Sequence, residues 1–144
     1  MRLVRVMNML VLLLLVSVGV AAQTAQAAHA SQTAQEGDLS AYLDPAILLD
    51  LMEDPPDDFF LVDVRTPAEY ESGHIPGASN TELAIIAEEP PVDDLDATIV
   101  VYCRSGSRSA RAAAALRALG YTRVLDWGGV NRWPYELETV PQEQ

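Results

Sequence analysis

The sequence predicts an α/β fold in which a central parallel β-sheet carries helices on both faces. Two continuous apolar runs, 59–64 (FFLVDV) and 98–102 (TIVVY), are typical of strands that are buried on both faces. A helix signal follows each run, first a capping box and later an alanine-rich segment. Strands that alternate with helices at this spacing pair in parallel, because each connection crosses back over the sheet.

Two short helices are expected on either side of the first strand. Asp44 caps the earlier helix, which has Pro45 at its first position. After the strand, the capping box Thr66-Pro67-Ala68-Glu69 opens a helix that runs through Glu71, and Gly73 ends it. Proline is accepted at both helix starts, because the N–H that it lacks has no partner within the helix there.

The second half of the chain continues the alternation. A brief strand is expected at 78–80 and a short helix at 81–87. The strongest helix signal is 109–119, which is rich in alanine and is followed by Gly120 as a stop. A last short strand is expected at 123–126. Together with the two apolar runs, these strands complete one sheet.

Two acidic segments with consecutive prolines, 53–58 and 88–94, directly precede the two buried strands. Their carboxylates suggest calcium, but they have neither the ligand spacing of an EF-hand nor its turn glycine. We therefore interpret both segments as solvated loops that proline stiffens.

Length and composition narrow the possible functions. The 144 residues allow one compact domain, and 21 acidic against nine basic residues give a formal net charge of −12. All nine basic residues are arginines. This charge excludes a general binder of nucleic acid or anionic membranes, which needs a basic face. The single cysteine excludes an internal disulfide and a cysteine-rich zinc site, and two histidines disfavour a histidine metal site.

The first thirty residues have the pattern of a secretory signal peptide. Arg2 and Arg5 precede an uncharged run from residue 9 to 22, which is shorter than the roughly 20 residues that span a bilayer. Small residues then offer several cleavage sites between positions 22 and 30. We expect a signal peptide at 1–30; an uncleaved N-terminal anchor is the alternative.

The remaining chain divides into a flexible leader at 31–38 and the folded domain at 39–144. The leader contains mainly small and polar residues without an apolar period, so it is not expected to join a core. A cleaved signal peptide would leave no stable membrane span and would place the domain outside the cytoplasm. The expected location is therefore periplasmic or secreted.

The candidate active site is the turn between the second buried strand and the alanine-rich helix. Cys103 follows that strand at the carboxyl end of the sheet, where α/β folds place their sites. The residues of the turn are Arg104, Ser105, Gly106, Ser107 and Arg108. Gly106 allows backbone N–H groups to turn inward around an anion, and the positive end of the helix points at the same place. We expect the pKa of Cys103 to lie well below the free value of about 8.5.

Charge supports this assignment independently. Between Tyr102 and Thr122 the chain has four arginines and no acidic residue, although acids dominate elsewhere. A local positive site favours a small anion there. The alternative, that Cys103 is only a small buried apolar residue, explains neither the glycine-containing turn nor its arginines.

Short motifs run through the chain in a fixed order. They are Leu61–Arg65 (LVDVR), Glu69–Tyr70, Gly73–Ala78 (GHIPGA), Asn80, Val100–Ser109 (VVYCRSGSRS), Leu119–Tyr121 (LGY), and Gly128–Gly129 with Trp133. In this order they resemble the rhodanese, or sulfurtransferase, family over about residues 39–140. The resemblance implies an α/β sandwich around a parallel sheet, with Cys103 as the nucleophile that accepts sulfur. The loop backbone from Arg104 to Arg108 would cradle the persulfide.

The length of the loop separates this family from its relatives. Phosphatases on the same fold resemble it but have five residues between cysteine and arginine, whereas four lie between Cys103 and Arg108. A tighter loop fits one sulfur atom better than a tetrahedral oxyanion, which counts against a phosphatase or an arsenate reductase. Arg104 and Arg108 resemble the versions suited to thiosulfate.

The mechanism implied is a two-step transfer. Cys103 would take the outer sulfur of a small anionic donor such as thiosulfate and release sulfite, with Arg104 and Arg108 holding the donor's oxygens. A thiol, cyanide or a protein acceptor would then remove the sulfur, and no metal or organic cofactor is needed. The alternative from another class is a non-catalytic module that docks a partner and carries sulfur.

Other polar and aromatic residues receive structural interpretations. The resemblance implies that His74 lies in a turn, and we do not expect it to act as a base, because a thiolate formed by the loop needs none. Asp63 and Arg65 are expected to pair at the end of a core strand, although they could orient the loop. Trp127 and Trp133 either rim the site from the last loop or close the core, and the sequence leaves both open.

Overall fold

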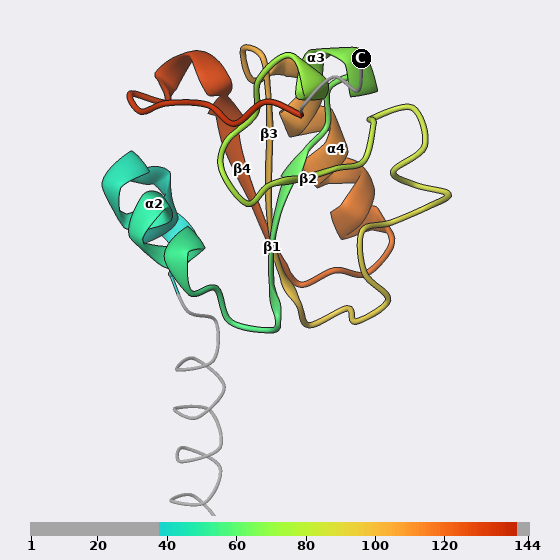
Figure 1. Cartoon of the computed structure of the whole chain (residues 1–144). Coiled ribbons are helices and arrows are strands. Elements are labelled where there is room, and N and C mark those ends of the chain that lie inside the picture. The colour runs from blue at the N-terminus through green and yellow to red at the C-terminus, as the bar shows by residue number, and fades with distance from the viewer. Residues whose placement is uncertain (1–37, 141–144) are drawn as a thin grey trace, which may run out of the picture. The chain divides into compact units, whose positions relative to one another are not determined.

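A four-stranded parallel sheet in the order β2-β1-β3-β4 lies at the centre of the computed structural model (Figure 1). Residues 38–140 are described; the predicted signal peptide and nearly all of the leader lie outside them. In chain order the elements are η1 (Leu39–Leu43), α2 (Pro45–Glu53), β1 (Phe59–Asp63), α3 (Pro67–Glu71), β2 (Ser79–Asn80), β3 (Thr98–Cys103), α4 (Ser107–Ala118), β4 (Arg123–Gly129) and η2 (Val130–Arg132).

The two predicted apolar runs are the central strands of this sheet. β1 pairs with β3 in parallel register from Phe59 opposite Thr98 to Asp63 opposite Tyr102. Because each of these strands has a neighbour on both sides and helices above and below, every residue of β3 is buried. The predicted α/β class and parallel pairing are confirmed.

Helices cover both faces of the sheet, with α2 on one side and α4 on the other (Figure 1). Alternate strand residues point to opposite faces, as the period of two requires. Val62, Val101 and Cys103 pack on the α4 side with Leu116. Leu61 and its neighbours on the other face pack with α2. Cys103 therefore points toward the helix that follows it.

The helix expected at 81–87 is not formed, and the segment is a series of turns. The N–H of Leu83 donates to the carbonyl of Val64, which ties this segment to the end of β1. Ile86 is fully buried against the sheet. The N–H groups of Ile86 and Glu89 still donate to the carbonyls four residues earlier, but these bonds do not continue into a regular helix. Tertiary contacts at Leu83 and Ile86 therefore outweigh the local helix signal.

The last strand is longer than expected, since β4 continues beyond 126 to Gly129. A register shift between Val101 and Tyr102 keeps it paired, so that Cys103 lies opposite Gly129. Trp127 is therefore a residue of β4, whereas the sequence pattern predicts a strand that ends at 126 and places Trp127 in the last loop. Trp127 and Trp133 are both buried in the core on the α2 side. Of the two alternatives, they therefore close the core and do not form the rim of the site.

Within residues 38–140, no helix has both the length and the apolar character needed to cross a bilayer.

Leu116 offers a test of the α4 face of the core, since its side chain is completely buried. We expect Leu116→Ala to lower the free energy of unfolding by about 3 kcal/mol, because the cavity adds to the lost apolar burial. Leu119→Ala is the matched control: Leu119 is 44% exposed, and its loss should cost less than about 1 kcal/mol. Urea denaturation measures both; equal losses would contradict this packing.

Candidate active site

Cys103 is the last residue of β3, and its side chain is enclosed by the loop that follows. Only 1% of the residue is exposed. The backbone N–H of Gly106 donates to the Cys103 Sγ at 3.1 Å, and the Ser109 hydroxyl oxygen lies 3.7 Å from the same sulfur. The sulfur is thus held among hydrogen-bond donors instead of facing open solvent.

Close packing against β4 gives the loop its shape. Gly106 has a φ of +104°, in the left-handed region that favours glycine, and a Cβ there would meet Gly128 at 3.6 Å. At Gly129 a Cβ would lie 2.7 Å from the Arg104 carbonyl oxygen and 2.8 Å from the Ser105 Cα. No side chain fits at Gly129 without moving the loop. The end of β4 and the loop therefore form one unit.

The loop lowers the pKa of the Cys103 thiol in spite of its burial. Burial by itself raises the pKa, because it disfavours the thiolate. Backbone N–H groups of Ser109, Ser105 and Gly106, with the Ser109 hydroxyl, stabilise the thiolate and outweigh that effect. The net shift is downward, so a larger share of the sulfur is thiolate, the nucleophilic form, than in a free cysteine at the same pH.

Ser109 is a site residue that the sequence interpretation did not single out. It is fully buried in the first turns of α4. Its hydroxyl oxygen lies 3.0 Å from the Gly106 carbonyl oxygen and 3.2 Å from the Gly128 carbonyl oxygen, and its one proton can be donated to either of these or to the Cys103 thiolate. Ser109 thus connects the loop, α4 and β4 around the sulfur. The sequence signal that could have identified Ser109 is its position directly after Arg108, the last residue of the loop.

Arg108, at the end of the loop, is held by a carboxylate from α3. Its Nη1 and Nη2 donate to the two Glu69 carboxylate oxygens at 2.6 and 2.8 Å. This hydrogen-bonded pair lowers the pKa of Glu69 to about 2. Glu69 also closes the predicted capping box with Thr66. The guanidinium fork of Arg108 is therefore occupied, and it fastens the loop to α3.

Arg104 has a different environment. It is exposed and makes no hydrogen bond or ion pair with any residue in the described part of the chain. It lines a pocket of about 420 Å³, the Arg104 pocket, together with Arg65, Glu69, Ser72, Val130, Asn131 and Leu137. Its charge is available to a ligand there.

Asp63 and Arg65 form a buried pair at the end of β1. The Arg65 Nη2 donates to the Asp63 carboxylate at 2.6 Å and to the Gly73 carbonyl at the same distance. The side-chain amide of Asn80 donates to the Asp63 carbonyl. These bonds join the ends of β1, β2 and α3, and no side-chain hydrogen bond within 38–140 runs from this pair to the loop. The pair therefore fastens these elements together, and Arg65 also lines the Arg104 pocket.

His74 is expected in a turn, but it forms an isolated antiparallel β-bridge with Glu138, and the turn of this segment lies at Pro76 and Gly77. Its ring stacks on Tyr70, its Nδ1 is 2.9 Å from the Tyr70 carbonyl oxygen, and its Nε2 is 3.7 Å from a Glu138 carboxylate oxygen. These contacts tie the C-terminal segment to α3. Within the described residues, no group of three or more His, Cys, Asp or Glu side chains is arranged to hold a metal ion.

The parallel sheet and the loop between β3 and α4 define a class of α/β domain with a cysteine at the carboxyl edge of the sheet. Residues 44–134 match the family model of the rhodanese-like domain. The chain belongs to the rhodanese family.

Curated relatives agree with this assignment. The chain is 44% identical over 78 residues to a sulfurtransferase of Allochromatium vinosum, covering 54% of this chain and 73% of that protein. It is 38% identical over 71 residues to the thiosulfate sulfurtransferase PspE of Escherichia coli, covering 48% and 68%. These relatives support a sulfurtransferase role for the chain.

A solved structure supports the fold. A rhodanese-like domain protein from Staphylococcus aureus matches with a TM-score of 0.58 and 28% identity. The match covers 67% of this chain and 95% of that one.

Because the pKa of Cys103 is lowered, its thiol should become reactive toward alkylating reagents at a lower pH than a free cysteine does. Iodoacetamide reacts with the thiolate, so the midpoint of the rate–pH curve should lie at a lower pH than for free cysteine titrated alongside. Ser109→Ala should move the midpoint upward, because it removes a hydroxyl that stabilises the thiolate. A midpoint at or above that of free cysteine would contradict this account of the loop.

Proposed function

We propose that the protein is a sulfurtransferase that carries a sulfane sulfur as a persulfide on Cys103. The observation that supports this most directly is the Gly106 N–H at 3.1 Å from the sulfur, in a loop that lowers the pKa of the thiol. The same inward-facing backbone would stabilise the negative charge of a persulfide.

In the first step, the Cys103 thiolate attacks the outer sulfur of a donor such as thiosulfate. A bond forms between Cys103 Sγ and that sulfur, the sulfur–sulfur bond of thiosulfate breaks, and sulfite leaves with the electron pair. Oxidation states balance because sulfane sulfur only changes its carrier. Charge on the departing sulfite needs a cation at the mouth of the site.

The two loop arginines divide these tasks. The sequence suggested that both Arg104 and Arg108 hold the donor, but the Arg108 fork is engaged by Glu69. Arg104 is exposed beside its pocket. We therefore assign donor binding to Arg104, and to Arg108 the positioning of the loop.

In the second step, an external acceptor removes the sulfur. The chain contains one cysteine, so no second thiol of its own resolves the persulfide. A thiol or cyanide, small enough to reach an enclosed sulfur, fits this step. A protein acceptor is the larger alternative. Export to the periplasm or beyond remains our proposal for the compartment in which these reactants are met.

Mass spectrometry of the intact domain tests the persulfide. After incubation with thiosulfate, the wild type should gain the mass of one sulfur atom and lose it on addition of cyanide, with thiocyanate formed. Cys103→Ala should gain nothing. A folded, reduced protein that takes no sulfur from thiosulfate would refute the enzyme proposal and favour the carrier module that docks a partner.

Steady-state kinetics tests the division between the arginines. Arg104→Gln should raise the KM for thiosulfate about tenfold, the loss expected for one charge-assisted contact. Arg108→Gln and Glu69→Gln should each lower kcat, and the double variant should be no worse than either, because the two side chains act as one unit. Arg117→Gln is the control for lost charge, since Arg117 lines neither pocket; its guanidinium donates to the Val124 carbonyl of β4 at 2.7 Å, so the stability of this variant is checked first. Additive effects of the Glu69 and Arg108 changes would contradict this assignment.

A further inference from the structure

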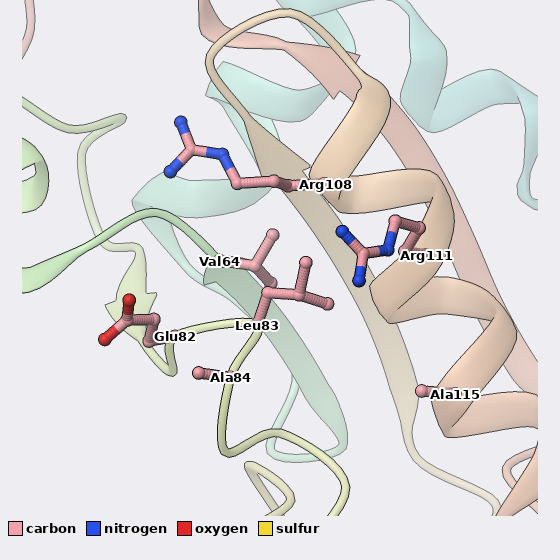
Figure 2. A pocket seen from close by; sticks show the side chains of 7 residues that line it. All are labelled: Val64, Glu82, Leu83, Ala84, Arg108, Arg111 and Ala115. Carbon is pink, nitrogen blue, oxygen red and sulfur yellow. The ribbon is translucent and has the colours of Figure 1, made fainter.

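A second pocket, of about 500 Å³, lies between α4 and the turns after β2; we call it the α4 pocket (Figure 2). Its apolar surface is formed by Val64, Leu83, Ala84 and Ala115. Charged residues complete the lining, namely Glu82, Arg108 and Arg111. A volume of this size, an apolar floor and a few polar groups are typical of a site for a small molecule.

Among the described residues, Arg111 is the unpaired cation of this pocket, and Glu82 is the one carboxylate in its lining. Its guanidinium reaches from α4 toward Val64 and Leu83, whereas the Glu82 carboxylate points away from them (Figure 2). Within residues 38–140, Arg111 makes no hydrogen bond or ion pair, while Arg108 is neutralised by Glu69. An unpaired arginine is notable in a chain with 21 acidic residues. An apolar floor under a free guanidinium fits an organic carboxylate.

The α4 pocket lies on the same side of the sheet as the nucleophile. Val64 in its floor and Cys103 belong to the same buried cluster beneath α4. Arg108, the last loop residue, lines the α4 pocket, and its partner Glu69 lines the Arg104 pocket. The ion pair between them therefore stands between two pockets, each of which has one arginine in its lining that is unpaired within the described chain.

We propose that the α4 pocket binds the carboxylate end of a small thiol that accepts sulfur from Cys103; this rests on the proposed function. Arg111 holds the carboxylate, the apolar floor takes the short carbon chain, and the thiol reaches the loop past Arg108. The acceptor sulfur bonds to the outer sulfur of the persulfide, and the bond from that sulfur to Cys103 Sγ breaks. Acceptor thiol and Cys103 persulfide become acceptor persulfide and Cys103 thiol, with the proton returned to the Cys103 sulfur.

A pair of acceptors that differ in charge tests this. With thiosulfate as donor, kcat/KM is measured for 3-mercaptopropionate and for neutral 2-mercaptoethanol, and their ratio is compared between variants. We expect Arg111→Gln to lower that ratio about tenfold, because only the carboxylate loses its partner. Arg111→Lys should retain part of it. Arg117→Gln, which removes the same charge from the same helix, should leave the ratio unchanged.

Binding is measured separately from turnover. The unreactive analogue 3-(methylthio)propionate should shift the amide NMR signals of Ala84, Arg111 and Ala115 in the wild type, and not in Arg111→Gln. An unchanged ratio in Arg111→Gln, or shifts confined to other residues, would overturn the acceptor site while leaving the persulfide enzyme intact. Failure of thiosulfate to load Cys103 would instead overturn the proposed function and, with it, this site.

Discussion

The packing of the Cys103 loop against the glycine end of β4 is the contact on which the site depends. Backbone N–H groups can face one sulfur only if the loop turns tightly, and Gly106 supplies the left-handed conformation for that turn. Gly129 lets β4 approach closer than any side chain would permit. The Ser109 hydroxyl then lies within hydrogen-bond distance of both sides of the contact. The donors around the sulfur are thus fixed before any substrate arrives, which is the condition for electrostatic stabilisation.

The three arginines around this loop, Arg104, Arg108 and Arg111, have different environments. Arg108 is paired with Glu69 and joins the loop to α3, so its positive charge is neutralised within the fold. Arg104 and Arg111 remain unpaired in the described part of the chain and face pockets on opposite sides of that pair. In a strongly acidic protein, such isolated cations concentrate the attraction for anions at the loop. Donor and acceptor can then be recognised by separate residues while sharing one sulfur.

Much of the fold follows from local pattern. The apolar runs of β1 and β3, the capping box of α3 and the alanine-rich α4 form where the sequence predicts them, because each signal is contained within a few residues. Two expectations were wrong for the same reason. The segment 81–87 is pinned through Leu83 and Ile86, and β4 is extended to Gly129 by its partner β3. Both outcomes depend on residues distant in the sequence, which a local pattern does not contain.

The sequence by itself determined the class of fold, the candidate nucleophile and the family, because a cysteine between a buried strand and a helix is a feature of adjacent residues. Only the tertiary structure decided how the charges are used. Glu69 and Arg108 are 39 positions apart, and their pairing is what separates the role of Arg108 from that of Arg104. The same holds for Arg111 and Val64, which meet in one pocket only after α4 packs on the sheet. Pairings of this kind depend on the distance between side chains in space, and one-dimensional spacing does not specify that distance.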